Sequence, residues 1–180
     1  IKIVEGHSWD YSLILKEKDK NFFFKNYAVY LDAPGPKFLS DSQMFNEKFP
    51  ETIKHTYPSL NRFFLYFENK KKLKVIIAPH PKTKIKDRSS LFYRRRVISN
   101  NTKNLIQNSK FIITRNSTAV TFAIYYNKPI VLFYTNETIN TESQKLSIEL
   151  ANSIGLKALN INELNFINLN QVLKFDKKKI

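Results

Sequence analysis

Three apolar runs decide the fold of this chain: VIIA at 75–78, FIIT at 111–114 and IVLF at 130–133. Each is typical of a strand, and the first two end in small polar clusters, HP at 80–81 and NST at 116–118. In a parallel α/β sheet, loops that leave the carboxyl ends of neighbouring strands converge on one crevice, where ligands bind. A histidine and two hydroxyls brought together there suit a ligand that carries phosphate.

Strand and helix periodicity alternate along the chain, which predicts an α/β fold: a Rossmann-like parallel sheet with helices on both faces. The predicted strands are 1–4, 27–31, 73–78, 110–114, 130–134 and 156–159. The predicted helices are 11–18, 57–70, 102–107, 118–126 and 141–154, of which the first also fits a strand. The tail 160–180 has no assigned element. With 180 residues and 42% hydrophobic content, one domain spanning 1–180 is expected.

The helix 57–70 has the clearest pattern. Pro58 falls in its first turn, where a missing N–H costs least, and a polar loop is expected before it, to about Thr56. Four apolar residues recur on one face and are predicted to be core: Leu60, Phe63, Phe64 and Phe67.

Two later helices also have terminal signals. Thr102 is predicted to cap the helix 102–107 and to direct Leu105 and Ile106 inward. The helix 141–154 is expected to end at Gly155, a residue that adopts the left-handed conformation readily. Its apolar face is predicted to carry Leu146, Leu150 and Ile154.

Composition excludes several kinds of site. The chain has no cysteine, which excludes disulfides and thiolate metal sites and fits a reducing compartment. It has three glycines, and neither the P-loop spacing nor the GxGxxG spacing occurs. No apolar run approaches the roughly 18–20 residues that span a bilayer. The start at Ile1, without a signal-peptide pattern, leads us to expect a domain cut from a longer, two-domain protein.

The net charge of +15 has more than one interpretation. The basic runs at 70–72 and 94–96 could bind nucleic acid, but no recognised nucleic-acid-binding motif accompanies them. The charge could equally attract nucleotide phosphates or the anionic face of a membrane. Nucleic acid is therefore the least favoured of the three partners.

The residues after the strands each have a functional and a structural interpretation. His80 can donate to a phosphate oxygen and can titrate near neutral pH, or it can be a loop histidine satisfied by backbone. Ser117 and Thr118 can bind an anion at the start of a helix, or simply cap that helix.

Three segments in this order resemble the donor-nucleotide half of GT-B bacterial glycosyltransferases of surface polysaccharide synthesis. They are APHP at 78–81, NSKFIITRNSTA at 108–119 and NKPIVLF at 127–133. The chain looks closest to enzymes with an HP motif and a Ser/Thr motif that use CMP-sugars, such as bacterial sialyltransferases and Kdo transferases. Teichoic-acid polymerases that use CDP-glycerol are similar at the same positions. The match is good over 73–135 and covers 27–72 only in outline.

The resemblance implies that His80, with Pro81, and the hydroxyls of Ser117 and Thr118, after Asn116, hold the donor phosphate. Groups preorganised there would stabilise the charge that grows on a leaving CMP. The resemblance also implies a metal-independent transferase without a cofactor, and the lack of an Asp-x-Asp motif agrees with this.

The roles of the charged residues near the strand ends stay open at this point. Asp10 and Asp32 are candidates for the general base, with helix or turn capping as the alternative for each. Glu137 could bind a donor hydroxyl or simply be exposed. Arg115 could pair with phosphate or be solvated in its loop.

The expected function is thus donor binding in a glycosyltransferase of surface polysaccharide or lipooligosaccharide synthesis, with CMP-sugar as the favoured donor and a glycan as acceptor. This half alone need not be active. The alternatives are a CDP-glycerol-type phosphotransferase and a basic module that binds nucleic acid or lipid without catalysis. The expected location is cytoplasmic, with possible peripheral contact with the anionic inner membrane.

Overall fold

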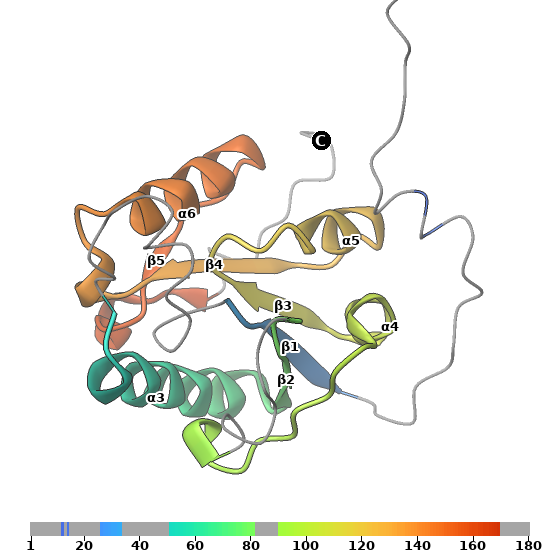
Figure 1. Cartoon of the computed structure of the whole chain (residues 1–180), viewed down its shortest axis with the longest axis horizontal. Coiled ribbons are helices and arrows are strands. Elements are labelled where there is room, and N and C mark those ends of the chain that lie inside the picture. The colour runs from blue at the N-terminus through green and yellow to red at the C-terminus, as the bar shows by residue number, and fades with distance from the viewer. Residues whose placement is uncertain (1–11, 13, 15–25, 34–50, 82–89, 170–180) are drawn as a thin grey trace, which may run out of the picture.

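In the part of the chain that the structure describes, five parallel strands form one sheet in the order β2-β1-β3-β4-β5 (Figure 1). The computed structural model describes residues 26–33, 51–81 and 90–169, together with Ser12 and Ile14. The strands are β1 (Tyr27–Leu31), β2 (Lys74–Ala78), β3 (Phe111–Thr114), β4 (Ile130–Tyr134) and β5 (Leu159–Asn160). The predicted α/β fold is confirmed, and the four predicted central strands are neighbours in the sheet.

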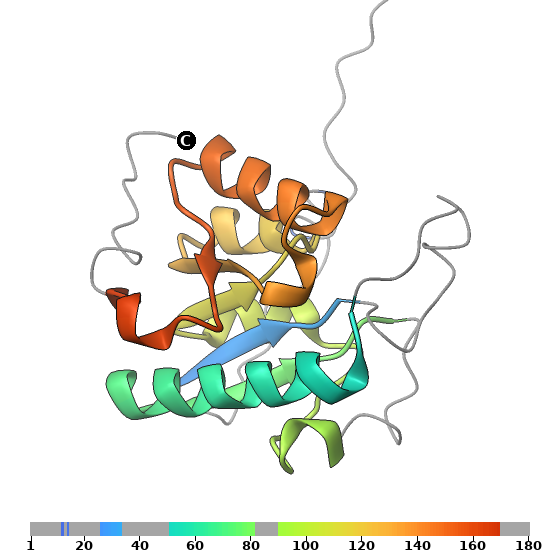
Figure 2. The same cartoon turned by 90° about the vertical axis from the view of Figure 1, so that its left-hand side faces the viewer.

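Helices cover both faces of the sheet, as predicted (Figure 2). The described helices are α3 (Ile53–Lys71), α4 (Thr102–Asn108), α5 (Val120–Tyr125) and α6 (Glu142–Ser153), with short 3₁₀ helices η2 (Ser90–Phe92), η3 (Asn136–Thr138) and η4 (Leu164–Phe166). Helix α3 packs on one face, and α4, α5 and α6 pack on the other. Both faces are apolar because every strand of a sheet covered in this way is buried on both sides.

The order of the strands creates a switch point. From β1 the chain passes through α3 to β2 at one side of β1, and it then returns to β3 at the other side. In open α/β sheets, ligands bind outside the carboxyl ends of the strands at such a reversal. The fold therefore indicates a candidate binding site at the carboxyl ends of β1, β2 and β3.

The predicted aromatic face of α3 is core, as expected. Leu60, Phe63, Phe64 and Phe67 are all buried. The ring centroid of Phe64 lies 5.1 Å from that of Tyr30 in β1. The prediction of a polar loop up to Thr56 is wrong, however, because α3 begins at Ile53 and Pro58 lies inside it. Hydrogen bonds that Thr52 and Thr56 donate to the distant Glu137 hold this added turn, as described below.

The predictions for helices α4 and α6 are confirmed in part, and they differ from the structure in the capping residue of α4 and in the buried face of α6. Leu105 and Ile106 are buried as predicted, but the capping position of α4 is Asn101, and Thr102 is its first helical residue. Helix α6 ends as expected before Gly155, whose φ is 69°. Its buried residues are Ser147 and Ala151, whereas Leu146 is 48% exposed.

The last strand begins at Leu159 instead of Leu156. The cause is the end of α6, where the Leu156 N–H donates to the Ala151 carbonyl at 2.8 Å and the Gly155 N–H donates to the Asn152 carbonyl at 3.1 Å. These two bonds form a Schellman motif. They hold Leu156 against the helix, so the chain reaches the sheet three residues later than predicted.

The outer side of β2 is paired with the segment that follows η2. The Ile77 N–H donates to the Arg96 carbonyl, and the Ile98 N–H donates to the Ile77 carbonyl, both at 2.9 Å. Val97 thereby forms an isolated parallel bridge with Ile77.

Two predicted elements lie largely or wholly outside the described residues. The strand 1–4 is not among them. Of the helix 11–18, only Ser12 and Ile14 are described, and both are helical. In the described part of the chain, no helix is long and apolar enough to cross a membrane.

Candidate functional site

The carboxyl ends of four strands form one rim that carries most of the predicted site residues. Asp32 follows β1, His80 and Pro81 follow β2, residues 115–118 follow β3, and Glu137 follows β4. Parallel pairing puts all of these positions at the same edge of the sheet. Asp10 lies outside the described residues.

His80 and Ser117 share this rim but follow strands that are not adjacent, contrary to expectation. Strand β1 separates β2 from β3, so the ends of β2 and β3 lie about 10 Å apart, given the usual spacing between strands. The gap between them is the switch point, with Asp32 at its centre. His80 is half-buried and Pro81 is exposed.

The turn after β3 positions the two hydroxyls differently. The Ser117 N–H donates to Thr114 Oγ1 at 3.4 Å, and Ser117 Oγ accepts from the Ala119 N–H at 3.3 Å. Thr118 is exposed, and its hydroxyl has no hydrogen-bond partner among the described residues. Ser117 therefore does some of the capping that the structural interpretation assigned to it, whereas Thr118 faces solvent.

Helix α5 begins two residues later than predicted because its first turn is tight. The Val120 N–H donates to the Ser117 carbonyl at 3.1 Å, and the Thr121 N–H donates to the Thr118 carbonyl at 3.2 Å. These i to i−3 bonds are those of a 3₁₀ turn, which often precedes an α-helix. Residues 117–119 are thus a turn that leads into α5, and the regular helix starts at Val120.

Arg115 is buried beneath the rim instead of being solvated. Its Nη1 forms an ion pair with Glu51, and the two side chains are 5% and 2% exposed. Burial alone would lower the pKa of Arg115, but the nearby charges of Glu51, Tyr30 and Asp32 raise it above its usual range. The guanidinium therefore stays charged, although its Nε has no hydrogen-bond partner among the described residues.

Tyr30 and Asp32 belong to the same buried cluster. Burial, followed by the charge of Asp32, raises the pKa of Tyr30 well above its usual value. Asp32 is itself buried, and its N–H donates to the Ala78 carbonyl at 2.9 Å. The cluster places a fixed positive group and two carboxylates directly under the switch point.

Glu137 caps α3. Its carboxylate accepts from the Thr52 N–H at 3.2 and 3.3 Å, from Thr52 Oγ1 at 2.7 Å and from Thr56 Oγ1 at 2.9 Å. The start of a helix has unpaired N–H groups and a positive dipole end, and an acidic side chain satisfies both. Glu137 is thus held by α3 rather than simply exposed.

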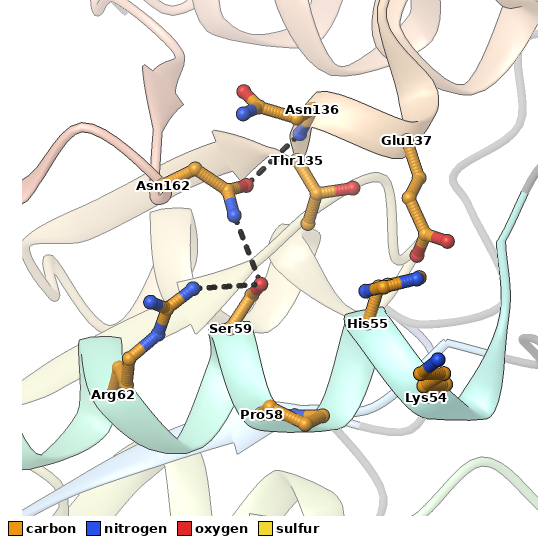
Figure 3. Close-up of a pocket in the computed structure, with 9 residues that line it drawn as sticks. All are labelled: Lys54, His55, Pro58, Ser59, Arg62, Thr135, Asn136, Glu137 and Asn162. Carbon is orange, nitrogen blue, oxygen red and sulfur yellow. Dashed lines mark hydrogen bonds between the residues drawn. The ribbon is translucent and has the colours of Figure 1, made fainter.

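A pocket of about 230 Å³ adjoins this end of α3 (Figure 3). Its lining includes Lys54, His55 and Arg62 from α3, with Asn136 and Glu137 from the segment after β4. Apart from Glu137, the sequence analysis did not identify these residues. The helical spacing of Lys54, Pro58 and Arg62 could have indicated a shared face, but it could not indicate what faces them.

The basic run at 94–96 lies within the described residues. Arg95, from the basic run at 94–96, pairs with Glu68 at 2.8 Å and donates to Asn61 Oδ1 at 2.8 Å. It is therefore a buried structural residue rather than part of a nucleic-acid surface. Among the described residues, no group of three His, Asp or Glu side chains could hold a metal ion.

No family model matches the sequence, and no curated protein matches it significantly. Among solved structures, the chain is similar to KpsC, the beta Kdo 2,4 transferase of Thermosulfurimonas dismutans, with a TM-score of 0.41 and 11% identity over 63% of this chain and 35% of that one. It is also similar to UDP-GlcNAc 2-epimerase of Methanocaldococcus jannaschii, solved with UDP-GlcNAc and UDP, with a TM-score of 0.45 and 14% identity over 86% of this chain and 42% of that one. The chain thus spans less than half the length of either protein. Both TM-scores are below 0.5, so neither likeness carries a conclusion about function.

Proposed function

We propose that this chain binds the nucleotide-activated donor of a glycosyltransferase. The observation that carries the proposal is the rim at the switch point, where His80 follows β2 on one side of β1 and the turn with Ser117 and Thr118 follows β3 on the other. A phosphate between them could accept hydrogen bonds from an imidazole and two hydroxyls. Such donors stabilise the charge that develops as the bond between sugar and phosphate breaks.

Arg115 has a positioning role in this proposal. It lies under the turn that carries Ser117 and Thr118, and its positive charge is neutralised by Glu51, with Asp32 as a second carboxylate nearby. The pair with Glu51 would hold the turn in place, and His80, Ser117 and Thr118 would make the contacts with the donor phosphate.

The finer assignments follow the sequence resemblance. The proposed donor is a CMP-sugar, and the proposed acceptor is a glycan of a surface polysaccharide or lipooligosaccharide. Asp32 is the proposed general base within the described residues, and Asp10 is the other candidate. The proposed location is cytoplasmic, with peripheral contact between the cationic chain and the anionic inner membrane.

The phosphate assignment can be tested with alanine substitutions. Replacing Ser117 and Thr118 together should weaken CMP binding about tenfold or more, because charge-assisted hydrogen bonds contribute roughly 1.5–3 kcal/mol each. Cytidine binding should hardly change, because the nucleoside has no phosphate. His80→Ala should show the same pattern. Calorimetric titration of CMP and cytidine into each variant measures both effects, and CDP, UDP and GDP test the choice of base.

A capping role alone predicts a different result. The double variant would then lose about 1 kcal/mol of folding free energy, and its affinities for CMP and cytidine would change equally. Equal losses for the two ligands would reject the phosphate site. Melting temperatures of the same samples separate the loss of binding from the loss of folded protein.

A further inference from the structure

Three adjoining hollows run along the outer side of α3. The first, of about 230 Å³, lies between α3 and the segment after β4, and Arg62 and Asn162 line it (Figure 3). The second, of about 270 Å³, is also lined by Arg62 and Asn162. The third, of about 410 Å³, shares Asn165 and Phe166 with the second. Because each hollow shares lining residues with the next, the three lie in a row along α3, and we call this row the α3 groove.

The α3 groove is long and begins at the rim. Lys54, Arg62 and Lys70 of α3 line its successive parts. At 1.5 Å per residue, Lys54 and Lys70 are about 24 Å apart along the axis. Its first part includes Glu137, which follows β4 at the carboxyl edge of the sheet, so the groove leads away from the candidate donor site.

The groove carries unbalanced positive charge. Among the described residues, Lys54, Arg62 and Lys70 form no ion pair. The guanidinium of Arg62 makes only a long bond of 3.5 Å to Ser59 Oγ, and Lys70 lies over the ring of Tyr66 at 5.9 Å. A row of cations along one helix without acidic partners favours an anionic ligand that extends along it.

Both carboxylates at the groove are already engaged. Glu137 accepts the hydrogen bonds of Thr52 and Thr56 that cap α3. Glu163 accepts a hydrogen bond of 2.9 Å from Asn160 Nδ2. Neither carboxylate forms an ion pair with the lysine and arginine side chains of the groove.

The other lining groups suit a saccharide. Asn162 bridges the two walls, because its Nδ2 donates to Ser59 Oγ at 2.9 Å and its Oδ1 accepts from the Asn136 N–H at 2.9 Å (Figure 3). Amide and hydroxyl groups of this kind can exchange hydrogen bonds with sugar hydroxyls. Phe166 is 85% exposed and offers a flat apolar face, such as the ring of a sugar covers.

Two other polyanions fit the groove less well. Single-stranded nucleic acid is bound by aromatic side chains on which successive bases stack, and Phe166 is the one large aromatic side chain at the groove that is mostly exposed. A membrane surface is broad and binds side chains that project from the protein. Lys54 and Arg62 are exposed, but with the buried Ser59 they border a hollow instead of a projecting face.

We propose that the α3 groove binds a linear anionic glycan, which enters or leaves the donor site along α3. This inference rests on the proposed function, because the glycan in the groove would be the acceptor or the product of the proposed glycosyltransferase reaction. The substrate class that we infer is an acidic polysaccharide. Arg62 and Lys70 would contact carboxylate or phosphate groups that lie about 12 Å apart along the glycan, with intervening units between them.

The test compares charge removal inside and outside the groove. The variant Arg62→Gln with Lys70→Gln should bind a hexamer of galacturonate about tenfold more weakly than the unaltered chain, because two charge-assisted contacts are lost. Lys110→Gln with Lys157→Gln removes the same charge from exposed positions outside the groove, and it should change the affinity less than twofold. Calorimetry or fluorescence titration at fixed salt measures both variants.

Three outcomes would overturn the inference. The first is an equal loss of affinity in both double variants, which would show that only net charge matters. The second is equally tight binding of maltohexaose, a neutral glycan of the same length. The third is tighter binding of a thymidine oligonucleotide or of vesicles with phosphatidylglycerol than of the galacturonate hexamer, with the same dependence on Arg62 and Lys70.

A CMP titration on the same proteins separates this inference from the proposed function. The groove variant should retain CMP affinity, and His80→Ala should lose it while it retains the affinity for galacturonate. Absence of CMP binding by the unaltered chain would count against the donor site. If the unaltered chain binds CMP but the two double variants have equal affinities for the galacturonate hexamer, the groove is rejected and the donor site is not.

Discussion

At the scale of single residues, the hydroxyl of Tyr30 is a polar group placed inside the apolar core. It is buried and has no hydrogen-bond partner among the described residues. Tyr30→Phe should therefore raise the free energy of unfolding by about 1 kcal/mol at neutral pH, because a buried polar group without a partner is costly. Tyr27→Phe is the matched control. It should lower stability by about 1 kcal/mol because it removes the bond of 3.0 Å to the Leu105 carbonyl.

Tyr30→Phe should also change how the free energy of unfolding depends on pH. Burial raises the pKa of Tyr27 to about 12, and burial with the charge of Asp32 raises that of Tyr30 well above its usual value. A group whose pKa is higher in the folded state contributes stability below its unfolded pKa and loses it as pH rises. Stability should thus fall above about pH 10, and less steeply in Tyr30→Phe. Urea denaturation at several alkaline pH values measures the slope, and an unchanged slope would contradict the prediction.

Residue identity alone could not have predicted the place of Arg115. The sequence left open whether it pairs with phosphate or is solvated in its loop, and the structure shows a buried partner of Glu51. Glu51 comes 64 positions earlier, within a stretch that the sequence analysis treated as a polar loop. Local signals predict short-range contacts well, but two charges this far apart in sequence give no local pattern.

At the scale of elements, the start of α3 depends on another part of the chain. Glu137→Ala should lower the free energy of unfolding by about 1–2 kcal/mol, because it removes the hydrogen bonds to Thr52 and Thr56 and the negative charge at the helix start. Glu149→Ala removes a carboxylate from an exposed position of α6 and should change it by less than about 0.5 kcal/mol. Urea denaturation of both variants measures the difference. Equal effects would show that Glu137 does not cap α3.

This long-range cap explains why the helix was predicted to start late. Residues 53–56 have no helix signal of their own, and Pro58 is typical of a first turn. The aromatic face of α3 and the end of α6 at Gly155 were predictable because periodicity and glycine preference are local properties. The start of β5 was not predictable, because it depends on hydrogen bonds that the end of α6 makes with Leu156.

At the scale of the whole molecule, the pair of Glu51 and Arg115 joins the residues before α3 to the turn after β3. Arg115→Met alone should lower the free energy of unfolding by about 3–5 kcal/mol, since it leaves a buried carboxylate unpaired. Adding Glu51→Leu should recover most of the loss, because two apolar side chains replace two charges. Denaturation of the single and double variants measures the coupling.

An exposed ion pair provides the comparison for this experiment. Lys145 and Glu142 lie 3.8 Å apart with side chains more than half exposed. Glu142→Gln should change stability by less than about 1 kcal/mol. If Arg115→Met were equally mild, the buried pair would not hold α3 to the sheet. If the double variant were no better than the single one, the two charges would not be coupled.

The arrangement of the sheet and of the rim with the candidate site was predictable to a large extent. Apolar runs predicted the four central strands, and the carboxyl-end rule placed His80 and Ser117 at one edge of the sheet. The sequence did not predict that β1 lies between β2 and β3, because strand order depends on packing between helices and strands and not on any single run. The α3 groove was hidden for the same reason, since its second wall comes from residues far from α3 in sequence.

The bridge between Ile77 and Val97 has a consequence for how copies of this protein behave together. A free strand edge is a template on which another chain can add a strand, and this is a common route to aggregation. Residues 96–98 occupy the outer edge of β2, so the apolar VIIA run is not open to a second molecule. At the opposite edge, β5 is two residues long, which is too short to serve as a good template. Among the described residues, neither edge of the sheet thus offers a long free strand, and this disfavours the addition of strands from neighbouring copies in a crowded solution.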